Sequence, residues 1–146
     1  QTVAAEEAEQ AGVSEDAAAA DSAMTYYEVL LQDRTSSLFE CQRQNVYWET
    51  KQEHITVFKD SAEHDLILGA GAYDVSARLL EANLHVDDGW IGRKNPGVIV
   101  KVTDRSVLGT GAASDGPAKT AYAALLARDG WAAMDAVRNR RVLLLS

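Results

Sequence analysis

Two glycine-containing segments are the first candidates for ligand chemistry, because glycine lets the backbone approach a ligand closely. The first segment spans Gly109–Thr120. A phosphate-binding loop carries lysine directly after its last glycine, whereas here two residues, beginning with Pro117, separate Gly116 from Lys119. We therefore expect a flexible loop that leads into a helix, and an enzyme acting on a nucleotide is disfavoured.

The second segment, Gly69-Ala70-Gly71, follows an apolar run and precedes a predicted helix. The free amides at a helix N-terminus suit anions. The segment lacks the third glycine of a dinucleotide-binding fingerprint. An ordinary tight turn and a close backbone approach to a ligand both remain possible here.

The other reactive side chains form no catalytic or metal-binding pattern. No two of the histidines, His54, His64 and His85, are spaced as a zinc-binding pair on one helical face, so we expect solvated surface residues. Cys41 is the single cysteine, which excludes an internal disulfide and a Cys-rich zinc module and leaves a packed or free thiol. With no nucleophile elbow and no distinctive carboxylate pair, we expect no enzymatic activity, cofactor or metal site.

Aromatic side chains near predicted loops and strand ends are better ligand-binding candidates. Ligand sites in open α/β sheets form at the ends of the strands. The alternative is that these rings cover the core. The side chains concerned are Tyr47, Trp48, Tyr73 and Trp90.

Composition narrows the class of partner. The chain has 146 residues and a formal net charge of -8, which argues against binding to nucleic acid or to anionic lipid. No apolar run has the roughly 18 residues that a membrane span requires. Gln1 opens an acidic stretch rather than a basic start followed by an apolar run, so no signal peptide is visible.

The elements that must position these side chains alternate between strands and helices. Residues 1–22 are acidic and rich in alanine, and we interpret them as a frayed helix, tail or linker before a single α/β lobe over 23–146. The alternation favours a layered domain with a largely parallel sheet. The predicted strands span 24–31, 46–48, 55–58, 98–102 and 141–145, with the last two buried, and the predicted helices span 72–83, 118–127 and 131–137.

Two segments of the second half resemble the C-terminal lobe of the periplasmic binding proteins that deliver iron–siderophores, haem and cobalamin to ABC importers. Asn95–Val102 is similar to the family's Asn-Pro-Asp-Val-Ile strand, although Gly97 replaces the aspartate. Gly130–Val142 is similar to the stretch that closes the lobe, with Arg140 where glycine is usual. Weaker similarities cover Thr25–Val29, Gly69–Tyr73 and Leu79–Ala82.

The resemblance implies a layered α/β/α lobe that captures a ligand without covalent chemistry. In this family the ligand lies between two lobes joined by a long helix, and the chain matches one lobe, either an excised domain or a single-lobe relative. The cleft-facing loops would lie near 31–34, 69–73 and 103–110. The implied ligand-binding residues are Gly71, Tyr73, Arg105 and Trp48.

The resemblance also implies partners and a location. The ligand would be a small-molecule metal chelate, and Glu81 would dock on the membrane subunits of an ABC transporter, in an extracytoplasmic setting. The alternative is a non-catalytic interaction or dimerisation module that has lost ligand binding. In that case segment 24–31 or 45–59 would pair with a second copy, as a possible homodimer.

Overall fold

The computed structural model describes residues 3–108 and 115–146, with the side chains of 3–16, Glu40 and Asp115 outside the description. It divides the chain into two units, residues 1–38 and residues 39–146. The division therefore follows Leu38, whereas the sequence analysis placed it after residue 22.

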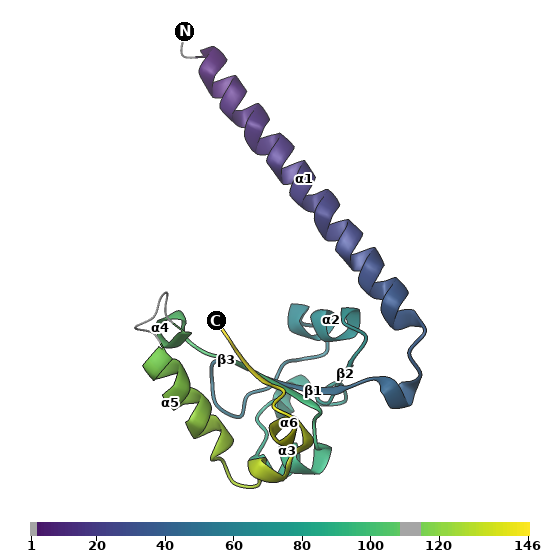
Figure 1. Cartoon of the computed structure of the whole chain (residues 1–146), viewed down its shortest axis with the longest axis vertical. Coiled ribbons are helices and arrows are strands. Elements are labelled where there is room, and N and C mark those ends of the chain that lie inside the picture. Colours follow the sequence, from purple (N-terminus) through teal and green to yellow (C-terminus); the bar gives the residue numbers. More distant parts are fainter. Residues whose placement is uncertain (1–2, 109–114) are drawn as a thin grey trace. The chain divides into compact units, whose positions relative to one another are not determined.

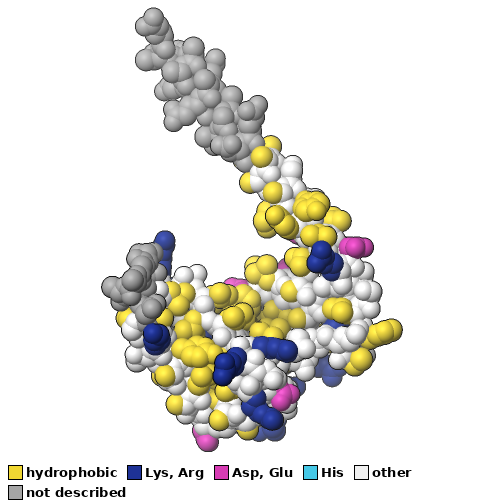
Figure 2. Space-filling model, viewed as in Figure 1, with side chains coloured by type: hydrophobic (Ala, Val, Ile, Leu, Met, Phe, Trp, Pro, Cys, Tyr) yellow, Lys and Arg dark blue, Asp and Glu magenta, His cyan; other side chains and the backbone are white. Residues whose placement is uncertain are grey.

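Unit 1 consists of helix α1, Val3–Ser36. The predicted strand over 24–31 is wrong, because these residues continue the helix. No glycine or proline occurs between Gly12 and the end of the helix at Ser36, so no strong helix-breaking residue interrupts this stretch. Figure 2 shows the apolar side chains exposed along the second half of α1, among them Met24, Tyr27 and Leu31.

A parallel sheet forms the centre of unit 2 (Figure 1). Its described strands are β1 (Asn45–Glu49), β2 (Tyr73–Asp74), β3 (Val98–Val102) and β4 (Val142–Leu145), in the order β2-β1-β3-β4. Every pairing between these four strands is parallel, which confirms the predicted α/β class with a largely parallel sheet.

Helices lie on both sides of these strands, as Figure 1 shows for α2 on one side and α3 and α6 on the other. One face packs its Tyr47, Ile99 and Val142 into the main core. The other face packs Val46 and Val100 against α2. The helices are α2 (Ala62–Gly69), α3 (Asp88–Lys94), α4 (Arg105–Leu108), α5 (Asp115–Leu126) and α6 (Asp135–Arg138), with 3₁₀ turns η1 (Glu40–Gln42), η2 (Glu81–Asn83) and η4 (Trp131–Ala133).

The segment 72–83 contradicts the sequence analysis, which predicted a helix there. It instead contains β2, turns and η2. The side chain of Asp74 accepts hydrogen bonds from the backbone amide and the hydroxyl of Ser76 (2.8 and 2.6 Å), which gives the chain a local alternative to helix. The helix lies upstream as α2, where Ser61 caps the N-terminus by accepting from the amide of His64 (3.2 Å).

The strand prediction for 55–58 is also wrong, because this segment makes only isolated bridges, one of them between Ile55 and His85. The predicted buried strand at 98–102 and the helix at 118–127 are confirmed as β3 and α5, while residues 109–114 of the glycine segment lie outside the described residues. The predicted helix over 131–137 is a short 3₁₀ turn followed by α6.

The final strand is present but only partly buried. Val142 is buried, whereas Leu143 and Leu145 are 51% and 41% exposed. These two leucines pair with Val100 and Val102. They therefore point to the same face of the sheet as Val100, which is the face that packs against α2. Among the strands that the structure describes, β4 lies at the edge of the sheet and has one neighbour, β3, which is why it is more exposed than expected.

Candidate functional site

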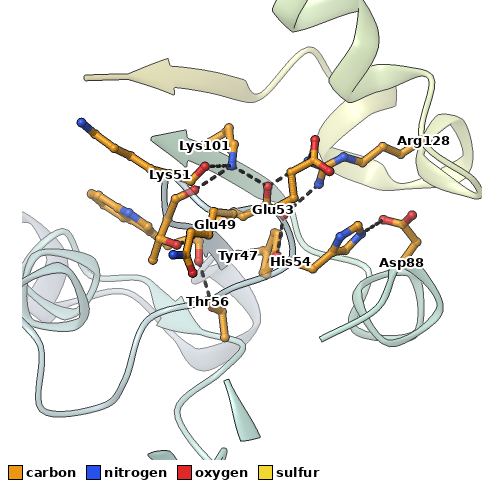
Figure 3. A network of polar contacts seen from close by, with 12 residues as sticks. Tyr47, Glu49, Lys51, Glu53, His54, Thr56, Asp88, Lys101 and Arg128 are labelled. Carbon is orange, nitrogen blue, oxygen red and sulfur yellow. Dashed lines mark hydrogen bonds and ion pairs between the residues drawn. The ribbon is translucent and has the colours of Figure 1, made fainter. Parts of the chain in front are cut away.

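The carboxyl ends of β1 and β3 carry a network of polar side chains (Figure 3). Glu49 ends β1, pairs in register with Lys101 of β3, and is fully buried. Arg128 donates two hydrogen bonds to its carboxylate, from Nη1 to Oε2 (2.8 Å) and from Nη2 to Oε1 (3.0 Å). Lys101 Nζ approaches Oε1 at 2.9 Å, and the hydroxyl of Tyr47 donates to Oε2 at 2.9 Å.

This environment fixes the charges of the network. Burial alone would raise the pKa of Glu49, but hydrogen bonds from Arg128 and Lys101 outweigh it and hold the pKa below its ordinary value of 4.5. Burial would lower the pKa of Arg128, but its hydrogen bonds to Glu49 and the charge of Glu49 raise it. Burial, and then the charge of Glu49, raise the pKa of Tyr47 well above its ordinary range, so its hydroxyl stays protonated and donates.

A second set of contacts fixes the position of Arg128. Its guanidinium lies over the ring of Trp131, 5.0 Å from the centroid. The indole Nε1 of Trp131 donates to Asp88 Oδ1 (2.7 Å), and the same oxygen contacts His54 Nε2 at 3.1 Å. Arg128 is therefore fixed by an ion pair on one side and an aromatic ring on the other.

An open pocket of about 330 Å³ lies beside this network, and we call it the carboxyl-edge pocket. Both cations of the network, Lys101 and Arg128, line it, and α5 supplies an apolar wall. Rigid cations next to an apolar surface can bind a ligand that carries both negative and apolar groups. The lining residues are Glu53, His54, Lys101, Thr103, Val107, Ala121, Ala124, Leu125, Arg128 and Leu144.

Two of the predicted ligand-binding residues, Arg105 and Trp48, lie at the carboxyl edge. Arg105 is exposed and begins α4 just after β3. Trp48 points to the opposite face of the sheet from Glu49, where it lines a second pocket of about 350 Å³. Its buried indole Nε1 has no hydrogen-bond partner within the described part of the chain.

The other two predicted ligand-binding residues, Gly71 and Tyr73, lie at the opposite edge. Tyr73 pairs with Asn45, the first residue of β1, and so stands about 13 Å along the strand from Glu49. Arg43 holds this corner by donating to the carbonyl of Gly71 (3.0 Å) and lying 5.9 Å from the ring centroid of Tyr73. The structure therefore does not bring the four predicted residues into one site.

The remaining predicted positions are scattered. The 31–34 segment lies within α1 rather than in a cleft-facing loop, and Glu81 is exposed at the start of η2. The prediction that all three histidines are solvated is wrong for His64, which is buried and contacts Asp74 Oδ2 at 2.7 Å. Cys41 is an exposed free thiol.

The sequence analysis missed Glu49, Lys101 and Arg128. One signal could have found them: Lys101 interrupts the apolar run of 98–102. A lysine within a buried strand requires an acidic partner, and a charged residue ending another parallel strand is the natural candidate.

The described residues contain neither a metal-binding cluster nor a membrane-spanning helix. They contain no cluster of three or more His, Cys, Asp or Glu side chains arranged to hold a metal ion. Among them, no helix combines the length and apolar character needed to cross a membrane.

No protein-family model matches the sequence, and no curated protein matches it. Solved structures do match its fold. An ABC transporter substrate-binding protein from Listeria monocytogenes matches with a TM-score of 0.65 and 19% identity over 90% of this chain and 48% of its own. The TroA-like periplasmic binding protein FepB from Veillonella parvula matches with a TM-score of 0.62 and 19% identity over 81% of this chain and 37% of its own.

A third match is the periplasmic protein MolA of Haemophilus influenzae, solved with molybdate bound, with a TM-score of 0.58 and 21% identity over 80% of this chain and 32% of its own. The chain thus spans less than half the length of each of these proteins. Residues 39–146 make up about three quarters of the chain, so a match over 90% of it extends into α1. These neighbours are solute-binding proteins rather than enzymes, and the chain has the fold of one lobe of such a periplasmic binding protein.

Proposed function

We propose that the chain is one lobe of the solute-binding component of an ABC importer, and that it binds a small-molecule metal chelate of the iron–siderophore, haem or cobalamin type. The observation that carries the proposal is the match of 90% of the chain to a substrate-binding protein of such a transporter. The presence of a pocket at the carboxyl ends of the parallel strands supports it, because ligands of open α/β sheets bind at that edge.

The carboxyl-edge pocket is suited to binding without chemistry. Glu49 holds Lys101 and Arg128 in place before any ligand arrives, so little side-chain entropy is lost on binding. The apolar wall from α5 offers contact for the non-polar part of a chelate. At the same edge, Arg105 is placed to add a further positive charge.

The same proposal gives roles to helix α1 and to Glu81. Helix α1 would be the long helix that joins this lobe to a second one, and the protein would act outside the cytoplasm. Glu81 is exposed and would dock on the transporter's membrane subunits. The substitution Glu81→Lys should then weaken binding of the chain to the membrane subunits reconstituted in lipid nanodiscs. It should leave the affinity of the chain for the chelate unchanged.

The test of ligand binding uses two neighbouring alanines of α5. Both Ala123 and Ala124 are exposed, but only Ala124 lines the pocket. Titrating the whole chain with ferric siderophores, haem and cobalamin should give saturable quenching of tryptophan fluorescence, because Trp131 contacts Arg128. Ala124→Phe should weaken that quenching and Ala123→Phe should not. A wild-type chain that none of the three ligands quenches, or equal effects of the two substitutions, would refute the proposal.

One observation favours the alternative, a dimerisation module. No other strand within the described ranges pairs with the outer edge of β4, which exposes Leu143 and Leu145, and such an edge can pair with a second copy. Of the two segments first proposed for this pairing, 24–31 is helical, and within 45–59 the strand β1 already lies between β2 and β3. Light scattering would favour this alternative if it showed a stable dimer that binds none of the ligands and that Leu143→Lys dissociates.

A further inference from the structure

The buried network at the carboxyl edge is not electrically balanced. One carboxylate, Glu49, lies between two cations, Lys101 and Arg128, whose contacts with it are 2.8 to 3.0 Å long. Tyr47 stays protonated and adds no charge. Among these four side chains, which contact one another directly, positive charge exceeds negative charge by one, next to an open pocket; Asp88 acts on Arg128 only from beyond the Trp131 ring.

Glu53 brings a second carboxylate to Arg128 from the pocket side. Its Oε1 lies 3.5 Å from Nη2 of Arg128, and both side chains line the carboxyl-edge pocket. The two partners differ greatly in exposure: the Glu53 side chain is 74% exposed, and that of Arg128 is 12% exposed. Figure 3 shows both in the same polar network around Glu49.

Glu53 is held far more weakly than Glu49. Its distance to Arg128 exceeds the usual length of an N–H···O hydrogen bond, and this ion pair is the only polar contact given for its side chain among the described residues. An ion pair with so exposed a partner is screened by water. It changes a binding or conformational equilibrium constant by about fivefold at most.

The backbone beneath Glu53 is fixed, so its side chain can leave without moving the loop. Lys101 Nζ donates to the carbonyl oxygens of Thr50 and Lys51 at 2.7 and 3.1 Å. The amide of Thr50 donates to the carbonyl of Ile55 at 2.8 Å. A rotation of one exposed side chain is therefore enough to uncover the outer edge of Arg128.

We infer that Glu53 is a tethered counter-ion of Arg128, and that a negatively charged group of a ligand takes its place there. The ligand group displaces it and restores the charge balance. Glu53 thereby selects against ligands that bring no negative charge, because they would leave Arg128 unbalanced or would have to fit around the Glu53 carboxylate. The identity of the natural ligand rests on the proposed function, but the competition on Arg128 does not.

The experiment compares Glu53→Gln with Asp104→Asn. Asp104 is equally exposed, at 71%, and lies at the same edge but pairs with Lys51, so both substitutions change the net charge alike. Inorganic sulfate is the probe, titrated into the whole chain at constant ionic strength. Binding is followed by the NMR signal of the Arg128 Nε–H group, assigned by its loss in Arg128→Lys.

We expect Glu53→Gln to bind sulfate about threefold to fivefold more tightly than the wild type, and Asp104→Asn to bind it as the wild type does. Equal affinity in Glu53→Gln and the wild type would overturn the inference, and so would equal gains in both variants, which would reflect net charge alone. Glu53→Ala repeats the comparison with a second side chain, and unchanged thermal unfolding shows that each variant is folded.

The outcome also separates this inference from the proposed function. If metal chelates bind the wild type but Glu53→Gln changes neither sulfate nor chelate affinity, the inference fails alone. If no chelate binds while Glu53→Gln strengthens sulfate binding, the proposed function fails and the inference stands. If neither sulfate nor any chelate perturbs Arg128, both are refuted.

Discussion

Replacing Glu49 with glutamine should destabilise the lobe severely. The carboxylate is fully buried, and in the described part of the chain it is the only negatively charged group among the buried partners of Lys101 and Arg128. Glutamine keeps the shape but leaves two neighbouring cations without a counter-charge. Removing one partner of a buried ion pair typically costs about 3–5 kcal/mol, and the three contacts from two cations place Glu49→Gln in that range at pH 7.

The assay is urea unfolding of the wild type and Glu49→Gln over a range of pH. The pKa of Glu49 is lowered in the folded state, so its contribution to stability is present above the unfolded value of 4.5 and is lost as the pH falls through the folded pKa. The difference between the two proteins should therefore be constant from neutral pH down to about pH 5.5 and shrink at lower pH. Glu81→Gln, an exposed control, should change the free energy of unfolding by less than about 0.5 kcal/mol.

Two results would refute this reasoning. A cost below about 1 kcal/mol at pH 7 would mean that Glu49 acts as an ordinary exposed glutamate. A full-sized cost that persists unchanged to about pH 3 would mean that the loss comes from packing of the amide rather than from the missing charge.

Three further predictions test other parts of the fold and site. Asp74→Ala removes the buried acceptor of two hydrogen bonds from Ser76, so thermal unfolding should show a loss of about 2–4 kcal/mol. Ile99→Ala empties a fully buried position and should cost about 2–5 kcal/mol in urea unfolding. Arg105→Gln should weaken binding of an anionic ferric chelate by about twofold to fivefold in fluorescence titrations, whereas Tyr73→Leu, at the opposite edge, should leave it unchanged.

The parallel sheet was predictable because its central strand is marked by a local pattern. The β-branched run of β3 has few alternatives to a strand buried on both faces, and Gly116-Pro117 lies in the first turn of α5 as expected. The error at 24–31 has a definite cause. Tyr26, Tyr27 and Val29 favour strands, but strand propensity reflects packing on a sheet, and here the preceding alanine-rich helix continues through them.

The error at 72–83 comes from side-chain hydrogen bonds that a search for apolar spacing does not consider. Val75, Leu79 and Leu80 have helical spacing, but Asp74 bonds to Ser76 and His64, and the amide of Val75 donates to the carbonyl of Val46 in β1. The backbone is thereby extended along the sheet before a helix can start. In this segment, contacts with residues distant in the sequence determine the backbone conformation in place of the local helix propensity.

In the site too, the positions set by local sequence could be predicted, and the positions set by distant contacts could not. Arg105 follows an obvious strand, so its place at the carboxyl edge could be deduced from the sequence alone. The place of Arg128 could not, because it follows α5 and lies 79 residues along the chain from Glu49. Lys101 was the usable clue, since a charge inside an apolar strand requires a partner on a neighbouring strand. A search that pairs such internal charges with acidic residues ending other apolar runs would have selected Glu49 and located the pocket.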